Sequence, residues 1–396
     1  MHRNTSEVVR AGFVAAFGAE PVGVWSAPGR VSLMGDHTDI QDGLTYGFAY
    51  SARSAVAVSP RTDRTVRVRT DLTDEQVEVQ LDEIEPPQEH SWKDYPLGLL
   101  WVIRNWLPDH SFDDDRETPE LTGLDIFVST DVPIGAGLAS SASLCAALST
   151  ALNELWQLDQ PPSRLARFGH LVENDFIGAS SGMSDHVTVL FAEQERDVFY
   201  DARGNDATAI DADPLMNHGF RGMIVESGET HRNWAGKIND RHAACARVAE
   251  QLGFQSLREL SLSDLEAAED QLDPVDFRRA RFVVTEIQRV LDFTRLLRTE
   301  GLPPVLPLFG QSQQSLRDDF EVSTERLDLI CEVAAAVGSP AARMTGSGFG
   351  GAVFVIVPTD KYERLESALT EAFTEYGWDG LKVYPAQKSG AAHRDA

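Results

Sequence analysis

Cysteines, long apolar runs and an apolar leader are scarce or absent in this 396-residue sequence. Its three cysteines, Cys145, Cys245 and Cys331, are too few for a disulfide framework and show no metal-binding spacing. No apolar run approaches the roughly 18 residues of a membrane-spanning helix, and the first residues contain no apolar signal segment. These absences predict a cytoplasmic protein without a membrane partner.

Basic residues are also scarce relative to acidic ones. The chain has 35 Lys and Arg against 62 Asp and Glu, which gives a formal net charge of −27. A surface this acidic repels nucleic acids and anionic membranes, so neither is expected as a partner. The length predicts two domains, and a polar stretch at 201–217 suggests a division into residues 1–205 and 206–396.

The segment 133–143 combines glycines and serines between a strand-like run at 124–129 and an apolar helical pattern. Gly135 and Gly137 allow the backbone to bend and to approach a ligand closely. A loop between strand and helix directs backbone N–H groups and the positive end of a helix dipole toward an anion, usually phosphate. It is not a Walker A loop, because no Gly-Lys-Ser/Thr follows. A tight turn before a buried helix is the alternative interpretation.

A polar cluster follows a strand-like run near the N-terminus. Asp36, His37 and Asp39 fall within four residues, and Arg30 precedes them. Carboxylates and imidazoles bind sugar hydroxyls well, since charge-assisted hydrogen bonds are strong. A solvated loop is the alternative, but the apolar flanks favour a partly enclosed polar site.

The remaining patterns predict an α+β fold. The runs 187–191 and 197–200 are predicted to form a β-hairpin. Helical patterns dominate the second half, which ends in strand, helix and strand, as is typical of an antiparallel sheet covered by helices. A second glycine-rich segment at 345–351 is predicted to be a loop of close backbone approach, with a plain turn as the alternative.

Three segments in this order resemble the motifs of the GHMP kinase superfamily and, within it, of the galactokinases. They are Pro28–Asp39, Pro133–Ser143 and Arg343–Gly351. Similar segments lie between them, so the resemblance covers nearly the whole chain. It implies an N-terminal domain like domain 2 of ribosomal protein S5 and a ferredoxin-like C-terminal domain, with the active site between them.

The resemblance also implies ATP-dependent phosphorylation of the C1 hydroxyl of a sugar, with galactose as the leading candidate and Mg²⁺ as the metal. A monomer is expected. By position, Asp185 matches the catalytic carboxylate and Arg30 matches the guanidinium beside it, while Ser141 and Glu173 match the magnesium ligands. The residues that match sugar ligands are Asp36, His37, Asp39 and Gly182. The residues that match the nucleotide site are Trp92, Gly135, Gly137, Leu138, Ser140, Ser141, Ala142 and Ser143.

The sugar-facing positions depart from the galactokinase pattern more than the nucleotide-facing ones. The departures are Ser32 for Asn, Asp36 for Glu, Ile40 for Tyr, His186 for Gln and Ile238 for Tyr. A site built for particular hydroxyls discriminates strongly, because unpaired polar groups are costly. L-arabinose, galacturonate and N-acetylgalactosamine therefore stay as alternatives to galactose. A sugar sensor without catalysis is a further alternative, which the complete phosphate loop and catalytic residues disfavour.

Overall fold

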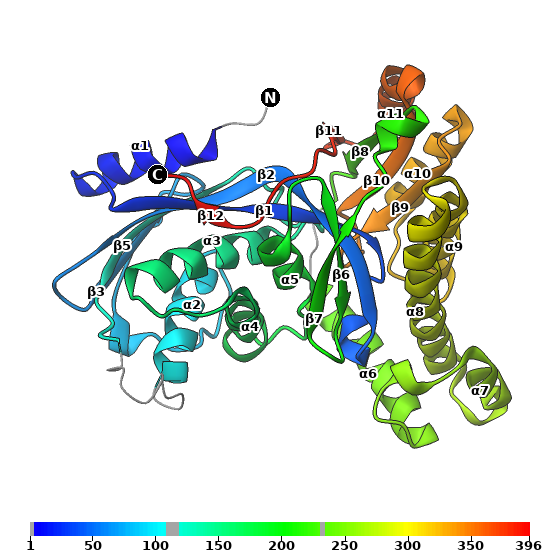
Figure 1. Ribbon diagram of the computed structural model, residues 1–396, viewed down its shortest axis with the longest axis horizontal. Helices are drawn as coiled ribbons and strands as arrows, with labels where there is room; N and C mark the ends of the chain where they lie inside the picture. Colours follow the sequence, from blue (N-terminus) through cyan, green and yellow to red (C-terminus); the bar gives the residue numbers. More distant parts are fainter. Residues whose placement is uncertain (1–3, 108–118, 230–233) are drawn as a thin grey trace.

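The structure, a computed structural model, describes residues 4–107, 119–229 and 234–396. It consists of two β-sheets with helices packed on them, the first built mainly from the first half of the chain and the second from the second half (Figure 1). This confirms the predicted α+β fold. In the described residues, no helix has the length and apolar character needed to cross a membrane.

The first sheet has eight strands in the order β12-β1-β2-β5-β3-β4, with the hairpin of β6 and β7 attached to the other half of β2. Its strands are β1 Gly23–Met34, β2 Leu44–Pro60, β3 Thr65–Thr70, β4 Val77–Gln80, β5 Leu124–Thr130, β6 Arg196–Asp201, β7 Asp206–Asp211 and β12 His393–Arg394. The long strand β2 pairs with β5 near one end and with β6 near the other. It therefore connects the two halves of the molecule.

Helices cover both faces of this sheet, which explains why every residue of β1 is buried. Helix α1 lies on one face, and α3 lies on the other with α2, α4 and α5 (Figure 1). Their bounds are α1 Thr5–Phe17, α2 Asp94–Trp106, α3 Ser140–Leu155, α4 Pro162–Leu171 and α5 Ser184–Phe191. A π-helical turn, Val172–Phe176, follows α4. This turn and the start of α5 both point toward the N-terminal end of α3, so they can contribute to one site.

The predicted hairpin of 187–191 and 197–200 is wrong. The first of these segments belongs to helix α5, and the hairpin pairs β6 with β7. A short apolar run does not distinguish a strand from a buried helix by periodicity alone. The preceding Asp185 lies in the first turn of the helix, where the helix dipole favours a negative charge.

The second sheet is antiparallel, with the order β11-β8-β10-β9. Its strands are β8 Phe220–Glu226, β9 Ala341–Thr345, β10 Ala352–Pro358 and β11 Lys382–Pro385. The helices of this half are α6 Trp234–Leu252, α7 Leu262–Ala267, α8 Pro274–Glu300, α9 Leu306–Asp318, α10 Glu325–Val337 and α11 Tyr362–Glu375. Helices α9, α10 and α11 contact β9 and β10 and cover the sheet (Figure 1).

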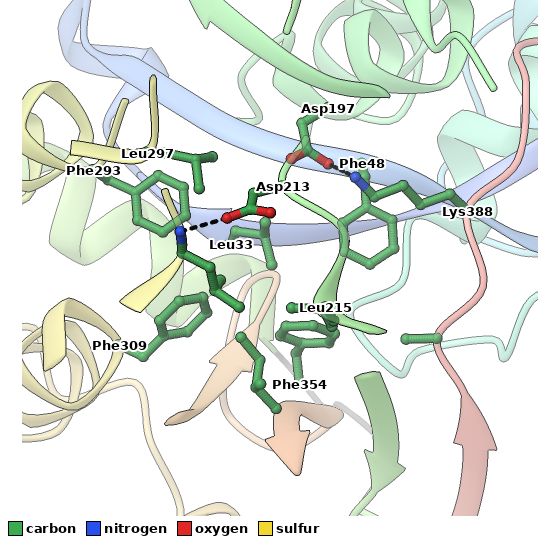
Figure 2. A pocket seen from close by; sticks show the side chains of 13 residues that line it. Leu33, Phe48, Asp197, Asp213, Leu215, Phe293, Leu297, Phe309, Phe354 and Lys388 are labelled. Atoms are coloured by element: carbon green, nitrogen blue, oxygen red, sulfur yellow. Dashed lines mark hydrogen bonds and ion pairs between the residues drawn. The ribbon is translucent and has the colours of Figure 1, made fainter. Parts of the chain in front are cut away.

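A shared apolar core joins the two halves. Phe48 of β2 contacts Phe354 of β10, with ring centroids 5.7 Å apart. A cavity of about 70 Å³ lies between apolar side chains there, and an ion pair between Lys388 and Asp197 closes one end of it (Figure 2). The hydroxyl of Tyr46 donates a second hydrogen bond to Asp197, at 3.2 Å. Both charged groups of this pair are therefore compensated inside the core.

The chain passes between the two halves more than once. The β6–β7 hairpin spans residues 205 and 206, and the C-terminal segment returns to the first sheet, where β12 pairs with β1 (Figure 1). The division at 205/206 stays a prediction. The last residues nevertheless connect the two halves, because they run from the second sheet to the first. Arg30 and the phosphate loop, residues 133–143, also lie on the first sheet.

Candidate active site

The loop before α3 has the geometry of an anion site. Gly135 and Gly137 adopt φ values of 72° and 70°, in the left-handed region that glycine tolerates. Helix geometry leaves the first-turn N–H groups at 140–142 without an intrahelical acceptor, and the N–H of Ser143 already donates to the carbonyl of Ala139. Three amides and the positive end of α3 therefore face the loop.

The second glycine-rich segment packs against this loop, as predicted for a close-approach loop. A Cβ atom on Gly137 would lie 2.5 Å from the carbonyl oxygen of Thr345. A Cβ atom on Gly351 would lie 2.9 Å from the carbonyl oxygen of Ala136. The two backbones meet at distances that exclude side chains, so the end of β9 supports the phosphate loop.

The neighbours of the loop attach it to the first sheet. The carbonyl of Leu138 accepts a hydrogen bond from the N–H of Arg30, at 3.1 Å. The hydroxyl of Ser143 donates to the carbonyl of Ala27 at 2.7 Å and accepts from the N–H of Ser54 at 3.1 Å. Ser143 is buried and its side chain is directed at the sheet, so it anchors α3 from beneath.

A cavity of about 100 Å³ lies beside the loop. Trp92, just before α2, is one of its walls, and the indole N–H of Trp92 donates to Glu75 at 3.0 Å. The lining combines apolar and aromatic side chains with a few hydroxyls, and it consists of Ser54, Leu72, Trp92, Tyr95, Val128, Ser129, Thr130, Ile134, Ser140, Ser141 and Leu144. Such a lining suits a flat aromatic ring attached to a phosphate chain.

Glu173, in the π-helical turn, faces the start of α3. Its Oε1 accepts from the hydroxyl of Ser141 at 2.9 Å, and its Oε2 accepts from the hydroxyl of Ser181 at 2.6 Å. The Nε2 atom of His186 lies 3.5 Å from the same Oε2. Burial opposes ionisation of Glu173, but His186, Ser181 and Ser141 outweigh burial and lower its pKa to about 2. The carboxylate is therefore charged at neutral pH.

Ser141 and Glu173 form a donor set that fits Mg²⁺. One hydroxyl oxygen and one carboxylate oxygen converge at the start of α3. Within the described residues, no group of three or more His, Cys, Asp or Glu side chains is placed to hold a metal. Mg²⁺ takes one or two protein oxygens and completes its shell with waters and substrate phosphates, so a site with few ligands suits it.

Arg30 and Asp185 form a bidentate pair next to the phosphate loop. The Nε and Nη2 atoms of Arg30 donate to the two carboxylate oxygens of Asp185, each at 2.8 Å. The Nη1 atom of Arg30 donates to the carbonyl of Gly137. Burial raises the pKa of Asp185 above its usual range, while Arg30 acts in the opposite direction. One guanidinium thus connects the carboxylate to the loop.

Asp39 and Gly182 lie together next to Asp185. The Oδ2 atom of Asp39 accepts from the N–H of Ser184, at 3.0 Å. A Cβ atom on Gly182 would lie only 1.8 Å from that oxygen, so glycine is required there while Asp39 keeps its place. Burial raises the pKa of Asp39, and the charge of Asp185 adds to the effect. The structure therefore places these predicted sugar ligands beside the Arg30–Asp185 pair.

His37 has strained backbone geometry and an unpaired ring atom. Its φ is +68°, which is uncommon outside glycine and is often found at functional sites. Its ring packs on Phe320 with centroids 4.9 Å apart, and its buried Nε2 has no hydrogen-bond partner in the described structure. Burial lowers its pKa to about 4, so the imidazole is neutral at pH 7.

Two residues that the sequence analysis left without a role are part of this site. Arg343, the first residue of the third motif, is 1% exposed and binds Asp36. Ser181 binds Glu173 and lies in a loop rich in Gly and Ser, which was the available signal for it. Of the divergent positions, Ile238 is 3% exposed and belongs to the apolar core of the second half.

Three comparisons with known proteins identify the family of this chain. The chain matches the models of the GHMP kinases N terminal domain over residues 105–193, the galactokinase galactose-binding signature over 11–60 and the GHMP kinases C terminal family over 296–375. It is 36% identical over 385 residues to a galactokinase of Streptomyces coelicolor, covering 96% of each chain. It is 34% identical over 355 residues to a galactokinase of Mycobacterium tuberculosis, covering 90% of this chain and 94% of that relative.

A solved structure has the same overall fold. The chain superposes on Lactococcus lactis galactokinase complexed with galactose with a TM-score of 0.89 and 26% sequence identity, covering 98% of this chain and 99% of that one. The matches extend over both sheets and include the segments that hold the Arg30–Asp185 pair and the phosphate loop. The chain therefore belongs to the galactokinase family of the GHMP kinases.

Proposed function

We propose that the protein transfers the γ-phosphoryl group of ATP to the C1 hydroxyl of galactose, giving galactose 1-phosphate and ADP. The observation that carries this proposal is the position of Arg30, which binds both Asp185 and the carbonyl of Gly137. A partly buried carboxylate thereby lies next to a loop shaped for phosphate. Phosphoryl transfer depends mainly on positioning and charge neutralisation, which this arrangement supports.

Asp185 is proposed to accept the proton of the C1 hydroxyl while the oxygen of that hydroxyl attacks the γ-phosphorus of ATP. Burial raises the pKa of Asp185, which makes it a better proton acceptor than an exposed aspartate. Arg30 stabilises the negative charge that develops on the transferred group, because its guanidinium lies between Asp185 and the loop. Both side chains therefore act at the reacting atoms.

The nucleotide is proposed to bind along the phosphate loop. The glycine turn at 135–138 and the amides at 140–142 hold the phosphates, and the cavity beside Trp92 receives the adenine ring. Ser141 and Glu173 are proposed to hold Mg²⁺, which when bound neutralises phosphate charge. Ser143 acts on the phosphates only indirectly, by anchoring the helix to the sheet.

Galactose is proposed to bind at His37, Asp39 and Gly182. A neutral imidazole can donate a hydrogen bond to one sugar hydroxyl and accept one from another, and a carboxylate can accept hydrogen bonds from hydroxyls. Galactose is favoured over L-arabinose, galacturonate and N-acetylgalactosamine because the matched relatives are galactokinases and the galactose-binding signature is present. The complete set of catalytic side chains argues against a sensor. We also propose that the enzyme acts as a cytoplasmic monomer, without a nucleic-acid partner.

The test is ADP release from MgATP with a panel of sugars, namely galactose, L-arabinose, galacturonate, N-acetylgalactosamine and glucose. We expect galactose to give the highest kcat/KM and ADP release to require sugar. A higher kcat/KM for another sugar would identify that sugar, in place of galactose, as the substrate. Binding of galactose and ATP without ADP release would instead favour the sensor.

A further inference from the structure

We infer that Asp36 and Arg343 are positioning residues that fix the sugar loop, residues 35–39 after β1, at a set distance from the phosphate loop, residues 133–143. This inference rests on the proposed function, and it gives Asp36 a role other than the direct sugar contact predicted from the sequence. It depends on where the two carboxylate oxygens of Asp36 are directed, on the burial of Arg343, and on the contacts of the segment that follows Arg343.

The carboxylate of Asp36 is occupied by protein partners. Its Oδ2 accepts from Nη1 of Arg343 at 2.6 Å, and its Oδ1 accepts from the backbone N–H of Gly346 at 3.0 Å. The side chain is only 6% exposed. Both oxygens therefore point at the third motif.

Arg343 is fixed on its other side as well. Its Nε donates to the hydroxyl of Ser312 at 2.8 Å, and its Nη2 lies 3.4 Å from Oε1 of Glu286. Glu286 and Ser312 are fully buried, and Glu286 also accepts from the N–H of Gly35, one residue before Asp36, at 2.9 Å. Moving the guanidinium away from its partners would leave buried charges unpaired, which is strongly destabilising. The network therefore holds the guanidinium rigidly.

The strand end that carries Arg343 also touches the other two motifs. The hydroxyl of Thr345 accepts from the N–H of Ser32 on β1, at 2.9 Å. The carbonyl of Thr345 lies where a Cβ atom of Gly137 would meet it at 2.5 Å. The segment 343–346 therefore contacts the sugar loop on one side and the phosphate loop on the other.

The segment 343–346 therefore sets the distance between the sugar, which accepts the phosphoryl group, and ATP, which donates it. His37 and Asp39 follow Asp36 directly in the chain, so a shift of Asp36 moves both proposed sugar ligands relative to Gly137. Misplacing a reacting atom by about 1 Å can cost about a hundredfold in rate. Loss of the Asp36–Arg343 contact should therefore lower the rate of transfer more than it weakens the binding of either substrate.

The test compares Asp36→Asn with wild type on galactose and on 2-, 3-, 4- and 6-deoxygalactose. We expect kcat to fall about ten- to a hundredfold, by a similar factor for every sugar, with KM for sugar and ATP changed by less than about threefold. Thr345→Val removes the hydroxyl that accepts from Ser32 and leaves Asp36 intact. It should lower kcat in the same pattern but by a smaller factor, and it carries the test if the Asp36 variant does not fold.

Asp197→Asn is the matched control, because Asp197 is also a buried carboxylate with a cationic partner but lies at the cavity of Figure 2. It should lower the unfolding temperature without changing kcat. A rate effect of Asp36→Asn that disappears for one deoxy sugar would mean that Asp36 binds the missing hydroxyl, and it would overturn the inference. So would an unchanged kcat in Thr345→Val. Absence of galactose phosphorylation in the wild type would refute the proposed function instead.

Discussion

The two sides of the active site, the donor side for ATP and the acceptor side for the sugar, are built from different kinds of chemical groups. The donor side consists of backbone amides, glycines and short hydroxyl side chains from one continuous segment, 133–143, with Glu173 added. The acceptor side consists of buried and partly buried charged side chains from β1, the loop after it, α5 and β9. The donor side is thus supplied mostly by one contiguous segment, whereas the acceptor side exists only when distant segments meet. Substitutions should therefore affect the two sides differently.

The largest effect should come from the acceptor side. Asp185→Asn keeps the size of the side chain but removes the proton acceptor, so kcat should fall about 10²- to 10⁴-fold. Binding of ATP, measured by calorimetry, should stay close to wild type because the amides at 140–142 are untouched. Asp201→Asn, which alters an ion pair with Arg258 outside the site, is the control and should keep its activity. Near-normal turnover of Asp185→Asn would remove Asp185 from the mechanism.

On the donor side, Glu173→Gln should change the metal requirement. Loss of one charged oxygen beside Ser141 should raise the Mg²⁺ concentration needed for half-maximal activity by about ten- to a hundredfold. EDTA should abolish activity of the wild type, and excess Mg²⁺ should restore it. Glu154→Gln, at the opposite end of α3 from Ser141, is the control. An unchanged Mg²⁺ titration of Glu173→Gln would contradict the proposed ligand.

A smaller effect should separate sugar binding from nucleotide binding. Gly182→Ala places a methyl group where the carboxylate of Asp39 now lies, so Asp39 must move. We expect KM for galactose to rise about tenfold, equivalent to about one hydrogen bond, and KM for ATP to stay unchanged. Gly310→Ala, on α9 with open space around the added methyl group, is the control. Equal changes in both KM values would show that the two sides are not separable.

The smallest effect concerns stability. Burial lowers the pKa of His37 to about 4 and that of His242 to about 3, from a usual value of 6.5. Between pH 4 and 6.5 the unfolded chain then binds more protons than the folded chain, so the free energy of unfolding rises with pH across this window. Urea unfolding at pH 5 and pH 7 should show this difference. His242→Gln should reduce it by about 1 to 2 kcal/mol.

The donor side could be predicted from the sequence because its features are contiguous. Gly135, Gly137 and the serines that begin α3 lie within one short segment, and the left-handed backbone of the two glycines follows from the conformational freedom of glycine. The second glycine-rich segment was likewise predicted as a place of close approach, and it packs on Gly137. The sequence did not predict which carbonyl would face that glycine.

The acceptor side was predicted less completely, because its partners are separated by hundreds of residues. The resemblance pointed to Asp36, His37 and Asp39 as one set, but the structure directs Asp36 at Arg343, 307 positions away in the chain. The strained backbone of His37 and the contact of Gly182 with Asp39 also depend on tertiary packing. The failed hairpin at 187–191 has the same origin, since only packing distinguishes a short buried helix from a strand.

The central claim is that the donor and acceptor sides meet at the C1 hydroxyl of galactose. The most direct measurement is nuclear magnetic resonance of the product formed from galactose and MgATP, with phosphorus coupling used to locate the new phosphate. We predict coupling to the anomeric proton in the wild type, and the same product formed at least about a hundredfold more slowly with Asp185→Asn. Phosphorus coupled to any other carbon position, or free phosphate as the only product, would contradict the account.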